Sequence, residues 1–165
     1  MNRRNILSLS TITALGLALL PNSSGLAQTK SLKDQLVGTW TLVSNTEVYQ
    51  DGRKKNSFGP ALKGAVSFDA NGKVTFMIIG ADLPTRSEIP AVSSRMVVAY
   101  FGTYSVDEAA KTVTYTAERA TEPRFDGLAR KATVTVNGDE LMQASASITT
   151  PQGTFTPNLV FKRAK

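Results

Sequence analysis

The chain has 165 residues, and its 19 lysines and arginines against 13 aspartates and glutamates give a net charge of +6 at neutral pH. It has no cysteine and no histidine, which excludes disulfides, thiol nucleophiles, Ser-His-Asp triads, His-ligated haem and the usual zinc sites. The basic residues are scattered rather than interleaved with aromatic ones, so the composition does not favour nucleic-acid binding.

The first residues have the three parts of a secretory signal peptide. An arginine pair precedes an apolar segment, and small residues follow up to Ala27. The pattern predicts a signal peptide over residues 1–27 and a mature domain over residues 28–165, exported to the periplasm or secreted and not stably inserted in a membrane. An uncleaved anchor is disfavoured because the apolar segment is shorter than the ~20 residues that span a bilayer. The arginine pair leaves the twin-arginine export route open beside the ordinary one.

From residue 36 onward the chain alternates apolar and polar residues between regularly spaced turn signals, which is typical of an all-β sandwich or barrel. Asn71-Gly72 is a strong hairpin signal because both residues tolerate a positive φ. The pattern predicts eight strands, over residues 37–49, 63–68, 73–79, 102–106, 112–119, 129–136, 140–146 and 154–162. Eight antiparallel strands in sequence favour an up-and-down barrel, since closure removes exposed sheet edges. Such a barrel has room inside for side chains or for one small ligand.

The connection between the third and fourth strands is too long for a hairpin. Over residues 92–100 it places Met96, Val97 and Tyr100 at helical spacing, so we expect one short helix there. Long connections often cover a functional opening, which makes Met96 and Tyr100 candidate lid residues. A helix that only plugs one end of the barrel is the alternative.

Trp40 is the only tryptophan and stands two residues after Gly38 at the start of the first strand. We expect its indole to close one end of the barrel, because the glycine allows a sharp bend and leaves room for the ring. Arg163, in the last strand, is the best-placed cation to stack on that ring. Gly38, Trp40 and Arg163 are therefore predicted to form a structural closure.

Three blocks of the chain resemble a known family. "GTWTLVS" looks like the opening Gly-x-Trp block of the lipocalin and calycin barrels, and "FGPALKGAVSFDANGKVTFMI" and "AYFGTYSVDEAAKTVTYTAE" resemble two blocks of the bacterial and fungal lipocalin-like domain family. The resemblance covers residues 36–161 and implies a calycin-type barrel. Members often carry histidines where this chain has Tyr115 and Thr116, so no activity that needs those histidines is carried over. An arginine also commonly follows the Pro-x-x-x-Gly loop of the family, and here Arg130 and Lys131 come slightly earlier.

The strand over residues 112–119 is the most informative about chemistry. Tyr115 and Ala117 belong to its apolar alternation and should face inward, and the same alternation carries Arg119 to the inner face. There Arg119 could anchor a carboxylate or phosphate. If the strand ends or bulges first, Arg119 points to solvent or pairs with a nearby glutamate.

Further aromatic and apolar side chains leave two orientations open. Phe125, in the loop "TEPRFDG", could touch a ligand at the barrel lip or pack back on the barrel. Phe76 and Ile78 alternate with Met77 and Ile79, so both faces of the third strand are apolar. One face must line the interior. The other face is covered either by the predicted helix or by a second copy of the chain, so we expect a monomer or a weak homodimer.

The first prediction for function is binding of a small, mostly apolar or amphipathic molecule, with or without an acidic end. The candidate ligand-binding residues are Phe76, Ile78, Met96, Tyr100, Tyr104, Tyr115, Ala117, Arg119 and Phe125. Two other classes stay open: a cofactor-free isomerase or cyclase using Tyr115 or a carboxylate, and an envelope protein-interaction module whose barrel is filled by its own side chains. The residues favour binding over catalysis, and no catalytic residue, metal site or cofactor is predicted.

Overall fold

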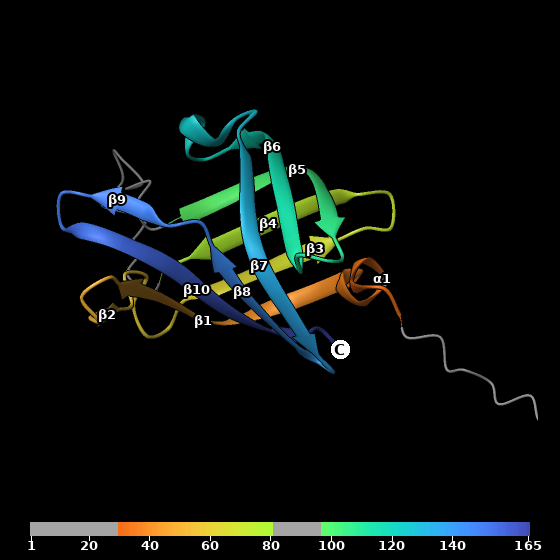
Figure 1. Cartoon of the computed structure of the whole chain (residues 1–165), viewed down its shortest axis with the longest axis horizontal. Coiled ribbons are helices and arrows are strands. Elements are labelled where there is room, and N and C mark those ends of the chain that lie inside the picture. The colour runs from red at the N-terminus through yellow and green to blue at the C-terminus, as the bar shows by residue number, and fades with distance from the viewer. Residues whose placement is uncertain (1–29, 81–96) are drawn as a thin grey trace, which may run out of the picture.

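The computed structural model describes residues 30–80 and 97–165, which form one antiparallel sheet closed into a barrel (Figure 1). Neighbouring strands follow the order β2-β1-β3-β4-β5-β6-β7-β8-β10-β9, and β1 also pairs with β10, which closes the wall. The wall strands are β1 (Gly38–Tyr49), β3 (Lys63–Phe68), β4 (Lys73–Ile79), β5 (Val97–Asp107), β6 (Thr112–Ala120), β7 (Ala129–Asn137), β8 (Glu140–Ser145) and β10 (Gly153–Arg163). Two short strands pair beside the wall: β2 (Lys54–Lys55) is antiparallel to β1, and β9 (Ile148–Thr150) is antiparallel to β10. The predicted eight-stranded up-and-down barrel is therefore confirmed.

The helix predicted between the third and fourth barrel strands is wrong over residues 97–100, because β5 already begins at Val97. In that strand Val97 pairs with Ile79 and Tyr100 with Phe76 of β4. Strand pairing gives each of these residues a cross-strand neighbour and buries Tyr100 inside the barrel, which outweighs the helical spacing of the same residues. The rest of the predicted helix, including Met96, and the predicted signal peptide over residues 1–27 lie outside the described residues.

The one α-helix of the described part precedes β1. It is α1 (Leu32–Leu36), and the Ser31 side chain caps it by accepting a hydrogen bond from the Asp34 amide. The Glu108 carboxylate accepts two more, from the amides of Leu32 and Lys33 at 2.8 and 3.0 Å. These bonds satisfy donors that a helix start leaves unpaired. Neither α1 nor any other helix among the described residues is long and apolar enough to cross a membrane.

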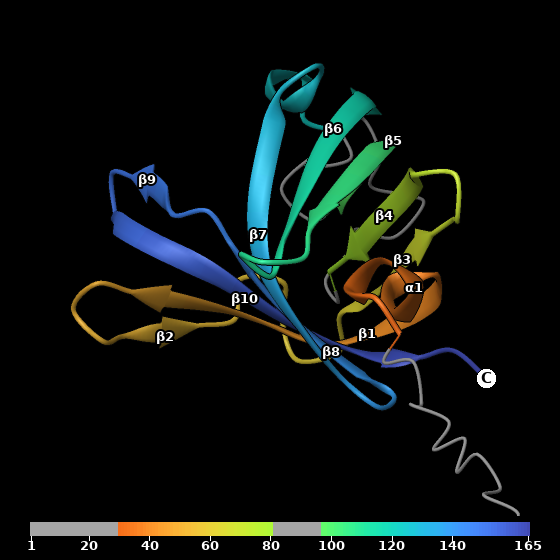
Figure 2. The same cartoon turned by 45° about the vertical axis from the view of Figure 1, so that its right-hand side comes forward.

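The barrel has two different ends. At one end lie α1, the C-terminus and the turns β3–β4, β5–β6 and β7–β8. At the other lie β2, β9 and the short helix η3 (Pro123–Phe125), as Figure 2 shows from a second side. Leu36, Trp40, Leu141 and Phe161 fill the α1 end and have no exposed surface. Asn45 and Glu47, two of the buried polar residues, lie on β1 toward the opposite end.

Candidate functional site

Trp40 and Arg163 close the α1 end. The indole N–H of Trp40 donates a 2.8 Å hydrogen bond to the Leu36 carbonyl oxygen, and the Arg163 guanidinium carbon lies 4.1 Å from the centre of the indole. Arg163 also donates hydrogen bonds to the carbonyl oxygens of Gln35 (2.9 Å) and Val37 (3.2 Å). Gly38 has φ +122°, a conformation that favours glycine, and a Cβ there would lie 3.4 Å from Arg163 Nη1. The predicted contact between Trp40 and Arg163 is thus present.

Six of the nine candidate ligand-binding residues face the barrel interior as one apolar cluster. They are at most 6% exposed: Phe76, Ile78, Tyr100, Tyr104, Tyr115 and Ala117. Tyr100 is part of the barrel wall rather than of a lid, and its ring stacks on Phe76 at 4.9 Å between ring centres. Tyr104 points toward the α1 end, where its hydroxyl donates to the Asp69 carbonyl oxygen at 2.7 Å.

Arg119 lies outside the barrel. The register between β5 and β6 shifts between Phe101 and Gly102, so that Glu118 is an extra residue in β6. This bulge reverses the alternation, and Arg119 pairs in register with the exposed Phe101. Its side chain is 74% exposed, and its guanidinium forms an ion pair with Asp126 at 2.8 Å. Of the two orientations open to the sequence, the structure shows the outward one.

A different arginine occupies the inner face at this end. Arg130, near the start of β7, pairs in register with Tyr115 and shares the inward side of its strand with Ala132 and Val134. Its guanidinium carbon lies 4.5 Å from the ring centre of Tyr100 and 4.2 Å from that of Phe125. Phe125 therefore packs back toward the barrel, over Arg130.

The Arg130 side chain has buried polar atoms without a partner. Its Nε and Nη2 are shielded from solvent and have no hydrogen-bond partner within the described residues. Charged groups kept from water are costly unless they are paired. The alternation of Arg130 with Ala132 and Val134 was the available sequence signal for its inward position.

Two tyrosine hydroxyls lie in the same interior. Tyr115 donates a 2.7 Å hydrogen bond to Gln143 Oε1, and Gln143 Nε2 in turn donates to Ser145 Oγ at 3.3 Å. Burial raises the pKa of Tyr115 well above its ordinary value. Burial also raises the pKa of Tyr100 to about 12, although the positive charge of Arg130 opposes the shift. Both hydroxyls are therefore protonated hydrogen-bond donors at neutral pH.

The far end of β1 adds buried polar groups that the sequence reasoning missed. A register shift between Leu42 and Ser44 reverses the inward face of β1, so that Asn45 and Glu47 become buried, at 5% and 8% exposure. Asn45 Oδ1 has no hydrogen-bond partner in the described part of the chain. A simple period-two pattern carried on from Trp40 assigns these residues to the outside, and no turn residue marks the bulge.

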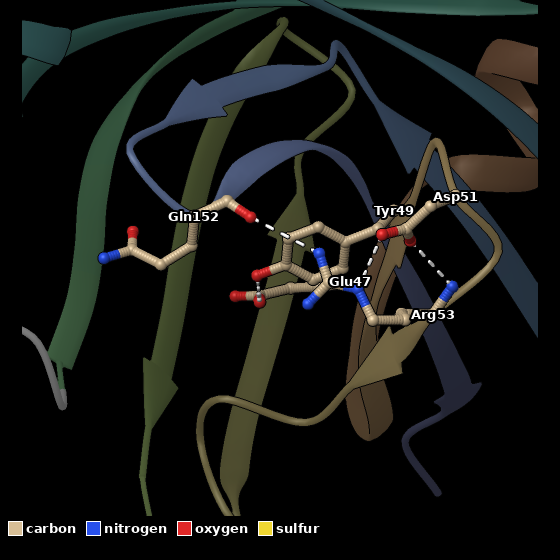
Figure 3. A network of polar contacts seen from close by, with 5 residues as sticks. All are labelled: Glu47, Tyr49, Asp51, Arg53 and Gln152. Atoms are coloured by element: carbon tan, nitrogen blue, oxygen red, sulfur yellow. Dashed lines mark hydrogen bonds and ion pairs between the residues drawn. The ribbon is translucent and has the colours of Figure 1, made fainter.

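A network around Tyr49 holds this end of β1 in place (Figure 3). The Tyr49 hydroxyl donates to Glu47 Oε2 at 3.2 Å, and the Arg53 guanidinium carbon lies 4.6 Å from the Tyr49 ring centre. Arg53 also donates to Asp51 Oδ2 at 2.6 Å and to the Gln152 carbonyl oxygen at 3.4 Å. Burial and the negative charge of Glu47 raise the pKa of Tyr49. The Glu47 carboxylate is thereby fixed toward its tyrosine partner.

The sequence profile of the lipocalin-like domain matches residues 37–164, which contain all eight strands of the barrel wall. The chain belongs to the lipocalin-like domain family. No curated protein matches it. A lipocalin-like barrel domain indicates ligand binding of some kind, and in this lipocalin-like barrel the buried polar groups at the end opposite α1 form the candidate site.

Two shallow hollows on this lipocalin-like domain, of about 350 and 370 Å³, lie on the outside near the α1 end. One is lined by residues such as Asn137 and Lys162, and the other by residues such as Ser67 and Lys73, none of them a candidate ligand-binding residue. In residues 30–80 and 97–165, no three His, Cys, Asp or Glu side chains are grouped to hold a metal ion. Met77, on the outer face, is 42% exposed, and a monomer or weak homodimer stays a prediction.

Proposed function

We propose that this lipocalin-like protein binds one small, mostly apolar molecule inside the barrel, in the half opposite α1. The α1 half is occupied by closely packed apolar side chains such as Trp40 and Phe161. The opposite half combines aromatic rings with inward polar side chains, which is the lining typical of ligand sites. The signal-like residues 1–27 support an exported location for this activity.

The observation that carries the proposal is the set of unpartnered buried atoms at this end. Asn45 Oδ1 and the Nε and Nη2 atoms of Arg130 have no hydrogen-bond partner among the described residues. An unmade hydrogen bond of a buried group costs about 1–3 kcal/mol, so few such groups persist without a reason. Polar atoms of a bound molecule would supply the missing partners, while Phe76, Tyr100 and Tyr115 would contact its apolar part.

The two alternative classes receive less support from the same site. A proton-transferring enzyme needs a group that changes its protonation state near neutral pH, and the raised pKa values of Tyr100 and Tyr115 work against a role as base. In a filled-barrel interaction module, the buried polar atoms of Asn45 and Arg130 would stay without hydrogen-bond partners. Its own prediction, a barrel that takes up no small molecule, is one outcome of the test.

The test is to express the full chain with its own leader and compare its mass under native and denaturing conditions. A native mass excess that disappears on denaturation, with the released compound identified by extraction, is the expected result. The purified protein is then screened by thermal shift with apolar acids, alcohols and amines.

A matched pair of variants locates the binding. Ala120 faces the core and pairs with Tyr100, whereas Ala129 is exposed at the start of β7. Ala120→Leu should fill the site and reduce uptake, and Ala129→Leu should leave it unchanged. Absence of any mass excess, together with no thermal shift by any compound, would reject binding in favour of the filled barrel. Trp40 serves as a folding reporter only, because it lies at the α1 end.

A further inference from the structure

Building on the proposed function, we propose that Arg130 selects ligands with a carboxylate end group, which it binds through the edge of its guanidinium that carries Nε and Nη2. The ligand class is then apolar monocarboxylic acids. Arg130 is a specificity-determining residue in this proposal, and the apolar wall of the barrel supplies the rest of the affinity.

The two unpartnered atoms of Arg130 are a geometrically matched pair. The N–H bond of Nε and one N–H bond of Nη2 point the same way from one edge of the planar guanidinium. Their spacing fits the two oxygens of a carboxylate, which can accept both hydrogen bonds at once. A hydroxyl or a carbonyl group presents one oxygen and leaves the second donor unmatched.

Two aromatic rings lie close to the Arg130 guanidinium. Its central carbon lies 4.5 Å from the Tyr100 ring centre and 4.2 Å from the Phe125 ring centre. These cation–π contacts restrain the side chain, and they leave Nε and Nη2 without a hydrogen-bond partner among the described residues. An arginine that is restrained by two rings and has Nε and Nη2 unpartnered is therefore prepared to bind an anion through these two donors.

Arg130 differs from the other arginines of residues 30–80 and 97–165 in its charge environment. Each of the others has a carboxylate oxygen within 4.0 Å: Arg53 with Asp51, Arg119 with Asp126, Arg124 with Glu122, and Arg163 with Asp139. Arg130 forms no ion pair with a described residue, although it is the arginine whose donors are shielded from water. The missing counter-charge is what a ligand carboxylate would provide.

The surrounding charges favour one negative charge over two. Glu47 is buried on the inner face of β1 in the same half of the barrel. Since Arg130 is the inward cation of that half among the described residues, a dianionic phosphate would add to the negative charge of Glu47 without a second cation. With Arg130 and Glu47 balancing each other, a monoanionic carboxylate adds one uncompensated negative charge to this half, whereas a dianion adds two.

The test compares decanoate with 1-decanol, which share their chain and differ in the end group. We expect the unaltered protein to bind decanoate about tenfold or more tightly than decanol by calorimetry. Arg130→Met keeps the bulk and removes the donors, and it should weaken decanoate about 10- to 100-fold while changing decanol less than about threefold. Arg119→Met, on the outer wall, is the matched control and should change neither.

Two further measurements keep the outcome decisive. Arg130→Lys keeps the charge without the paired donors, so it should recover only part of the preference and decides the matter if Arg130→Met does not fold. Sodium acetate should raise the thermal midpoint above that in sodium chloride of equal ionic strength, in the unaltered protein and in Arg119→Met but not in Arg130→Met.

The possible results separate the two proposals. Equal binding of decanoate and decanol, or equal weakening of both by Arg130→Met, would overturn the role of Arg130 and leave binding in the barrel standing. An acetate effect that requires Arg130, with no binding of either ten-carbon probe, would support the carboxylate site and count against binding of apolar chains. No preference for decanoate and no acetate effect would refute the inference about Arg130.

Discussion

Replacing Arg163 by methionine tests how the α1 end of the barrel is held closed. Arg163 stacks on Trp40 at 4.1 Å and donates hydrogen bonds to the carbonyl oxygens of Gln35 and Val37, at the end of α1 and just after it. Methionine keeps much of the side-chain volume over the indole but removes the charge and every donor. The substitution therefore separates the polar part of the closure from its packing.

The expected loss follows from these contacts. A partly desolvated cation–π contact contributes about 1–2 kcal/mol, and each hydrogen bond from a charged donor about 1.5 kcal/mol or more. Arg163 is 33% exposed, so water replaces part of what is removed. Its 3.5 Å ion pair with the exposed Asp139 adds less than about 0.5 kcal/mol. We expect Arg163→Met to lower the free energy of unfolding by about 2–4 kcal/mol, or the thermal midpoint by about 8–15 °C.

Denaturant unfolding followed by Trp40 emission measures this loss at the site itself, because Trp40 is the only tryptophan. Lys162→Met is the control, since Lys162 is the exposed neighbour of Arg163 in β10 and should lose less than about 0.5 kcal/mol. Arg163→Lys should fall between the two, because a lysine keeps the charge but not the guanidinium plane. A loss in Arg163→Met no larger than that in Lys162→Met would refute the assigned role of Arg163.

Two other predictions concern the β5–β6 bulge and the buried tyrosines. In Gly102→Ala the new Cβ would meet two backbone atoms of β6, the Thr116 carbonyl oxygen and, at 2.8 Å, the Glu118 amide nitrogen. We expect this substitution to lower the free energy of unfolding by about 2–4 kcal/mol. The control Gly138→Ala, where the space is open, should lower it by about 1 kcal/mol. Equal losses in denaturant unfolding of the two variants would show that the close approach at Gly102 is unimportant. Above pH 10 the unfolded chain loses tyrosine protons that the folded protein keeps, because the folded pKa of Tyr100 is about 12. The stabilisation is thus complete below pH 10 and is lost as the pH rises from 10 to 12, by about 2–3 kcal/mol from Tyr100 alone. Tyrosinate absorbance should appear together with unfolding, which circular dichroism follows. The part of the absorbance that is lost in Tyr100→Phe identifies the signal of Tyr100. Ionisation of Tyr100 near pH 10 while the protein is still folded would contradict this reasoning.

The barrel itself could be predicted from local patterns. Alternation with period two identified seven of the eight wall strands within about two residues, because each strand has one face buried and one in solvent. The hairpin at Asn71-Gly72 could be recognised because Gly72 needs its positive φ of +85°. The pairing of Trp40 with Arg163 followed from their places near the start of the first strand and the end of the last, which meet when the barrel closes.

The candidate site depended on irregularities that local patterns do not contain. The bulge at Glu118 turned Arg119 outward, and the register shift after Leu42 turned Asn45 and Glu47 inward. Where a strand gains an extra residue is set by its partner strand, here through the close approach of Gly102 to β6.

The helix predicted over residues 92–100 was wrong over residues 97–100 for a related reason. The spacing of Val97 and Tyr100 is compatible with a helical face, but β4 offers these residues a paired strand. Local sequence therefore sets which segments alternate and where they turn, since these depend on side chains a few residues apart. The identity of the inward arginine is set by register and bulges, since these arise only when distant strands pair.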